Sequence, residues 1–177
     1  MERKNWLWQL MGFATASLLG VLLHFLYYIT GGSVFAAPFS GVNESTWEHM
    51  KLLFWPMLLF ALVQGRFYTD RHDFWCVKLR GILLGLALIP VIFYTYNGAV
   101  GKSPDWLNIA IFFVSAALSY IYELHLLNKK PPAVCHKRAA ITALILLAAA
   151  VVIFTFLPPP LGIFTDPITG TAGVDNN

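Results

Sequence analysis

The 177-residue chain carries little charge: Asp, Glu, Lys and Arg make up only 12% of it, whereas hydrophobic residues make up 58%. A soluble domain usually has about 25% charged residues. The shortage is concentrated in long charge-free runs, and a helix needs about 20 apolar residues to cross the hydrocarbon core of a membrane. The composition therefore excludes an ordinary soluble domain and predicts a helical membrane protein. The runs lie between Lys4 and Glu44, Arg80 and Lys102, Asp105 and Glu123, and Arg138 and Asp166.

Cysteine is also scarce, and the two residues present, Cys76 and Cys135, are too few for a disulfide framework. Neither belongs to a CxxC or Cys/His pattern of the kind that binds structural zinc. Both fall in segments that the charge distribution places in the cytoplasm, where thiols stay reduced. We therefore expect two free thiols.

The net charge of +3 does not indicate nucleic-acid binding, because the basic residues flank apolar segments and form no stripe. Ten of the twelve Lys and Arg residues fall on one side of the predicted spans, and only Lys51 and Lys102 fall on the other. Cytoplasmic loops are enriched in Lys and Arg. This distribution predicts a cytoplasmic N-terminus and an outer C-terminus.

The chain reads as one all-α integral membrane domain, a polytopic bundle of five transmembrane helices. The first apolar run is about 24 residues long, against roughly 7–15 for the core of a cleavable signal peptide, so we expect it to be retained as a span. The small-residue segment 30–45 is expected to be interfacial or re-entrant, and 158–177 to be an extracytoplasmic tail. The five spans are predicted over 6–29, 46–65, 77–98, 105–127 and 138–157.

The second span is too short if it begins after its last charge. Only 14 uncharged residues separate Lys51 from Arg66, and at 1.5 Å per residue they cover about 21 Å of a core of about 30 Å. The helix can extend inward through Arg66, Phe67 and Tyr68, with Arg66 snorkelling, or outward to about Ser45. We favour the outward extension, which draws Glu48 and His49 into the membrane. Ser45 and Glu48 also fit the S-x-x-E capping box, so helix capping alone is an alternative explanation for this polar stretch.

The stretch V-N-E-S-T-W-E-H-M-K at 42–51, together with D-P-I-T-G at 166–170, resembles the hallmark of a family of small bacterial integral membrane proteins of unknown function. The resemblance extends over essentially the whole chain. It implies no established activity. It does imply that Asn43, Glu44, Ser45, Trp47, Glu48, His49 and Asp166 belong together, with the tail docked so that Asp166 lies over an outer pocket.

Other polar residues are predicted near the same outer side. His24 ends a stripe of Gly12, Ala16 and Gly20 at i+4 spacing, which suits close helix packing. Imidazole and carboxylate groups are ligands for a divalent metal such as zinc, so His24, Glu44, Glu48 and His49 are candidate metal ligands. The candidate catalytic residues are Glu44, Glu48, His49 and Asp166. The candidate pocket residues are Asn43, Trp47, Lys51, Tyr94, Asn97 and Glu123.

A second polar stripe, formed by Asn108, Ser115, Ser119 and Glu123, lies on one face of the fourth predicted span. Such a stripe should face protein or water, because polar groups are costly against lipid. It can be a path toward the cytoplasm, or Glu123 can simply neutralise a nearby Lys or Arg.

Three classes of function stay open. The first is a metal-dependent membrane hydrolase acting at the outer leaflet, in which a bound metal acidifies a water molecule. The second is a protein that binds or transports a small solute, an ion or a proton. The third is a non-enzymatic assembly factor or accessory subunit. The expected partners are membrane lipids and no nucleic acid, with a homodimer or a partner membrane protein as further options.

Overall fold

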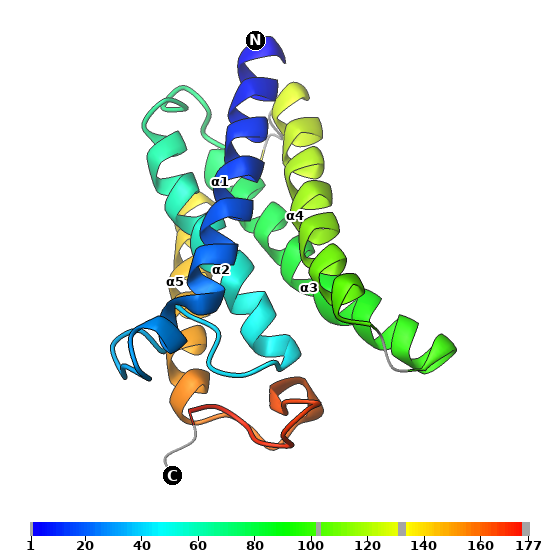
Figure 1. Ribbon diagram of the computed structural model, residues 1–177. Coiled ribbons are helices and arrows are strands. Elements are labelled where there is room, and N and C mark those ends of the chain that lie inside the picture. Colours follow the sequence, from blue (N-terminus) through cyan, green and yellow to red (C-terminus); the bar gives the residue numbers. More distant parts are fainter. Residues whose placement is uncertain (1, 102–103, 131–133, 175–177) are drawn as a thin grey trace.

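A computed structural model describes residues 2–101, 104–130 and 134–174 of the chain, and it is all-helical, as the composition predicts. Four of the described helices, α1, α3, α4 and α5, are long and apolar enough to cross a membrane. Figure 1 shows the bundle that they form around α2. The helices are α1 (Glu2–Ile29), α2 (Thr46–Gly65), α3 (Phe74–Val100), α4 (Asp105–Asn128), α5 (Lys137–Phe156) and a short 3₁₀ helix, η1 (Gly162–Phe164).

Helix α2 is the central element of the bundle. It packs against α1, α3, α4 and η1, and eleven of its 20 residues are buried. The charged residues of its first turns therefore meet protein, where ionisable groups are tolerated far better than against lipid. The prediction of a helix over about 46–65 is confirmed, whereas its role as a fifth span stays a prediction.

Small residues bring the helices into close contact, as the stripe on the first helix predicts. A Cβ atom added to Gly12 would collide with Phe60 and Tyr120, and one added to Gly20 would collide with Phe112. Ala16, between them, is fully buried. The stripe therefore lets α1 lie directly against α2 and α4.

The same device joins α3 to α4. Gly81 faces the carboxylate of Glu123, and a Cβ atom at Gly85 would lie 2.5 Å from the Ser119 hydroxyl. Ser119 and Glu123 are fully buried, and Glu123 forms a 2.5 Å ion pair with Lys78 of α3. The polar stripe of α4 thus faces protein, and Glu123 neutralises a lysine, which was one of its two predicted roles.

The bundle has two distinct ends (Figure 1). We call the end that carries residues 30–45, the start of α2 and the C-terminal segment 157–174 the motif end. We call the opposite end, which carries the N-terminus and the α2–α3 and α4–α5 connections, the basic end. The C-terminal prediction extends to residue 177, but residues 175–177 lie outside the described residues, as does Lys102.

The prediction of two free thiols is wrong, because Cys76 and Cys135 form a disulfide at the basic end. Their Cα atoms lie 6.3 Å apart although 59 positions separate them in the sequence. Cys76 lies in the first turn of α3, and Cys135 lies just before α5. The hairpin of α3 and α4 brings these positions together, and no spacing rule in the sequence reveals that.

Candidate functional site

The motif at 42–51 begins helix α2, and part of it is a helix cap. The Ser45 hydroxyl accepts a hydrogen bond from the Glu48 amide at 3.4 Å, as a capping box requires. The reciprocal bond of a capping box, from the Ser45 amide to the Glu48 carboxylate, is replaced by two others. The Ser45 amide donates to the Asn43 side chain at 2.9 Å, and the Glu48 carboxylate accepts from the Val42 amide at 2.9 Å.

Glu48 and Lys51 form a buried ion pair that does not face the cavity described below. Their side chains are 2% and 0% exposed, and Lys51 Nζ lies 2.6 Å from Glu48 Oε2. Lys51 also donates to the Ala37 carbonyl at 2.8 Å and to the Thr155 hydroxyl at 3.2 Å. The pair therefore fastens segment 30–45 and α5 to α2. The two residues are three positions apart on the helix (i, i+3), and the Glu48 carboxylate is directed to Lys51.

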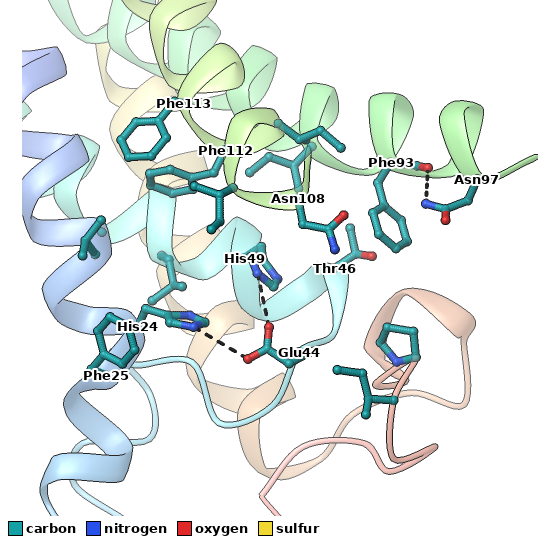
Figure 2. Close-up of a pocket in the computed structure, with 18 residues that line it drawn as sticks. His24, Phe25, Glu44, Thr46, His49, Phe93, Asn97, Asn108, Phe112 and Phe113 are labelled. Atoms are coloured by element: carbon teal, nitrogen blue, oxygen red, sulfur yellow. Dashed lines mark hydrogen bonds and ion pairs between the residues drawn. The ribbon is translucent and has the colours of Figure 1, made fainter. Parts of the chain in front are cut away.

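A second polar group at the motif end is the His24–Glu44–His49 cluster. Glu44 lies between the two imidazoles, with Oε1 3.7 Å from His24 Nε2 and Oε2 3.7 Å from His49 Nε2. The two rings are 5.9 Å apart between centroids. Figure 2 shows the carboxylate pointing toward both rings. The structure thus brings together three of the predicted site residues, from α1, the segment before α2 and α2 itself.

The hydrogen bond on the far side of the His49 ring fixes which nitrogen faces Glu44 as an acceptor. His49 Nδ1 lies 3.0 Å from the Ser45 carbonyl oxygen. A carbonyl can only accept, so Nδ1 carries a hydrogen. In a neutral ring Nε2 then carries a lone pair and no hydrogen, and it faces a carboxylate that can likewise only accept hydrogen bonds. The cluster therefore has room for one more proton, or for a donor group from a ligand.

The cluster lies at the polar end of a cavity of about 530 Å³. Glu44 and both histidines line it beside Thr46, Asn97 and Asn108 (Figure 2). The remaining walls are apolar and come mainly from α1, α3 and α4, so the cavity joins a hydrophobic compartment to a small polar end. The apolar lining residues include Val21, Phe25, Ile89, Phe93, Ile109, Ile111, Phe112 and Phe113.

The C-terminal segment docks on the motif through Asp166, as the paired motifs predict. Asp166 Oδ2 accepts from the Glu44 amide at 3.1 Å, while Oδ1 accepts from the amides of Ile168 and Thr169 at 2.7 and 3.2 Å. Burial alone would raise the pKa of Asp166, but these amide donors outweigh it and hold the pKa below its usual value. Asp166 is thus a docking residue.

Docking of this segment also completes the cavity. The two residues that follow Asp166, Pro167 and Ile168, form part of its lining. The Asn43 side chain donates to the Gly173 carbonyl at 3.2 Å and adds a second attachment.

The other predicted pocket residues separate into those at the cavity and those away from it. Asn97 lines it, and the Tyr94 hydroxyl lies 3.5 Å from the hydroxyl of Thr46. Trp47 instead packs between Phe154 and Phe164. Lys51 lies in its buried ion pair, and Glu123 is paired with Lys78 at the other end of α4. These three predictions placed polar or aromatic residues by depth alone, and depth does not fix which neighbour a side chain meets.

The expected metal-ligand set is not assembled. Within residues 2–101, 104–130 and 134–174, no group of three or more His, Cys, Asp or Glu side chains is arranged to hold a metal ion. Adjacent residues on a helix point about 100° apart, so Glu48 and His49 diverge, and Glu48 turns to Lys51.

Sequence reasoning missed the apolar walls. Phe112 and Phe113 lie within a helix that is hydrophobic along most of its length, so nothing in the pattern marks them as cavity residues. The one signal in the sequence was Gly20, because a glycine on a packed helix face leaves room for a large side chain from the neighbouring helix. In the structure the Phe112 ring occupies that room.

The chain belongs to a family of unknown function (DUF6512), whose sequence model matches residues 1–174. The resemblance to an uncharacterised family is thereby confirmed over nearly the whole chain, while the motif pattern and the bacterial origin stay predictions. No curated protein and no solved structure matches the chain.

Proposed function

We propose that this member of the family is an integral membrane protein that binds a small amphipathic molecule and acts on it at the His24–Glu44–His49 cluster. The observation that supports the proposal is the shape and lining of the cavity of about 530 Å³. Ligand sites are typically concave and mostly apolar, with a few polar groups that fix orientation. Here the apolar walls would hold a hydrocarbon chain, and the cluster would hold the polar group.

His49 is the residue best arranged for proton transfer. Its Nδ1 is held by the Ser45 carbonyl at 3.0 Å, which orients the ring and leaves Nε2 toward the cavity. Glu44, 3.7 Å from Nε2, would stabilise the imidazolium that forms when His49 takes a proton. This is the arrangement of a general base with an orienting group and a charge partner. It suits removal of a proton from water or from a hydroxyl group, as in a hydrolytic reaction.

Occupancy is tested by filling the cavity. Val21 of α1 lines it, whereas Leu18 on the same helix is 64% exposed and is not among its lining residues. We expect native mass spectrometry of protein extracted in a mild detergent to show one bound amphiphile. Val21→Trp should lose it and Leu18→Trp should retain it. Equal occupancy in the two variants, or none in the wild type, would refute the proposal.

Chemistry is tested separately from binding. His49→Gln removes the base but keeps a polar side chain of similar size. It should keep the bound amphiphile within about threefold in affinity while the turnover rate falls by about 10²-fold or more, the usual contribution of a general base. If the variant keeps full turnover of the identified molecule, His49 is not the base.

A transport function has one observation in its favour. The hydroxyl of Ser115 and Glu123 Oε1 are buried without a hydrogen-bond partner, on the stripe that starts at Asn108 beside the cavity. Against it, Gly85 and Gly81 bring the α3 backbone close to Ser119 and Glu123. Uptake into proteoliposomes that falls in Glu123→Gln would favour transport over the binding and acid–base role.

The membrane and the orientation belong to the same proposal. We place the protein in the bacterial plasma membrane with the basic end inside, because ten of its twelve Lys and Arg residues would flank the spans on that side. The cavity would then open toward the outer leaflet. Against this orientation, the Cys76–Cys135 disulfide lies at the same end, and thiols in the cytoplasm are normally kept reduced. If cavity and cluster variants change stability alone, the accessory-subunit hypothesis replaces this one.

A further inference from the structure

Apart from the two histidines, the charged group among the described residues that line the cavity is the carboxylate of Glu44. Glu44 carries a carboxylate, and the lone pair of neutral His49 Nε2 faces it from 3.7 Å. Among the described residues that line the cavity there is no lysine or arginine. Lys51, the cation of the same motif, is fully buried in its own ion pair. An anionic headgroup would meet the Glu44 carboxylate and no lysine or arginine among the described lining residues.

The start of α2 does not supply one either, although the N-terminus of a helix commonly attracts anions. The Ser45 hydroxyl already accepts from the Glu48 amide, and Asn43 accepts from the Ser45 amide. The carboxylate of Asp166 accepts from the Glu44 amide. Three backbone donors around this helix start, the amides of Glu44, Ser45 and Glu48, are therefore taken by side chains, one of which is an acid.

A second cavity, of about 680 Å³, adjoins the first and shares Glu44, His24 and Phe25 with it. Tyr27 and Tyr28 also line it, beside a turn in which Gly31 and Gly32 adopt φ values of +67° and +79° that suit glycine. Aromatic rings around a carboxylate are the surroundings that recognise ammonium groups, because ring faces attract cations. The described lining again contains no lysine or arginine.

We infer that the ligand of this site is an amphiphile whose headgroup is a protonated amine, held between Glu44 and His49 with its hydrocarbon chain in the apolar cavity. This inference rests on the proposed binding function and adds the chemical class. An ammonium group brings the N–H donors that both acceptors lack, and its charge balances Glu44. No covalent step is involved in this recognition.

The test compares four decyl compounds on protein reconstituted in nanodiscs of uncharged lipid, by isothermal titration. The compounds are decylamine, decyltrimethylammonium, decanol and decanoate. Decylamine should bind at least about tenfold more tightly than any of the others, a factor that corresponds to one favourable polar interaction. The trimethyl compound keeps the charge but cannot donate a hydrogen bond, so it isolates the contribution of the N–H groups.

Two variants separate the site from general charge effects. Glu44→Gln should weaken decylamine by about tenfold or more and leave decanol unchanged. Asp70→Asn, which removes an exposed carboxylate at the basic end, should change neither. Equal binding of decylamine and decanoate, or of decylamine and the trimethyl compound, would overturn the inference while leaving the binding function in place. Binding of none of the four would overturn the binding function itself.

Discussion

Lys51→Met should strongly destabilise the protein, because it leaves the Glu48 carboxylate buried without its partner. The Glu48 side chain is 2% exposed, and its Oε2 lies 2.6 Å from Lys51 Nζ. After the substitution only the Val42 amide still donates to it. The Ala37 carbonyl and the Thr155 hydroxyl lose their donor as well.

Breaking a buried ion pair by removing one partner costs about 3–5 kcal/mol of unfolding free energy. For a chain of this size each kcal/mol shifts the melting temperature by about 2–4 °C, so Lys51→Met should lower it by about 6–20 °C. The double variant Lys51→Met/Glu48→Leu removes both charges. Since a buried pair can be replaced by apolar groups at little net cost, it should recover most of the loss.

The measurement is thermal unfolding in one detergent, followed by tryptophan fluorescence, with the wild type and the two variants side by side. Retained cavity binding in the double variant would show that Glu48 and Lys51 support the fold and not the ligand. The reasoning would be refuted if the melting temperature of Lys51→Met lay within about 2 °C of the wild-type value, because such a shift is worth roughly 1 kcal/mol or less. A double variant no more stable than the single one would refute it as well.

Three further predictions concern other contacts. Asp166→Asn should loosen the C-terminal segment, which would be seen as faster proteolysis of residues 157–174. Because the pKa of Asp166 is lowered, its carboxylate stabilises the docked segment above the usual aspartate pKa, and this stabilisation is lost as the pH falls through the lowered value. The difference in proteolysis between the variant and the wild type should therefore vanish in acid. A pH-independent difference would contradict this. Cys76→Ser/Cys135→Ser should cost about 2–4 kcal/mol of unfolding free energy. Thiol labelling of protein purified without reductant should detect the two cysteines only after reduction, and labelling without reduction would contradict the pairing. Gly85→Val should separate α3 from α4 at Ser119 and cost about 1–3 kcal/mol of unfolding free energy. Gly98→Val is the control and should not be destabilising, because nothing lies within 4 Å of its Cβ position. Equal melting temperatures for the two variants would refute the close packing.

The fold could be predicted largely from the sequence. Charge-free runs fix where helices can lie in a membrane, and α2 begins at Thr46 and ends at Gly65 as predicted, because Ser45 caps it. The stripe of Gly12, Ala16 and Gly20 identified a packing face before its partners were known. These features are local, and local spacing decides them.

The candidate site could be predicted only in part. His24, Glu44 and His49 were chosen from depth and residue type, and they do meet. Glu48 was chosen in the same way and does not join them, because its carboxylate turns to Lys51 on the next turn. The roles of neighbours within one motif depend on side-chain direction, and adjacent helical positions differ by about 100°.

By itself the sequence determined an all-helical membrane protein with polar groups gathered at one end, since hydrophobic runs and caps act over a few residues. Only the tertiary structure decided which polar groups share a cavity and which are buried as structural pairs. It also decided that Cys76 and Cys135 are bonded and that Pro167 and Ile168 close the cavity. Contacts of this kind join positions far apart in the chain, and their energy depends on packing that no single segment encodes.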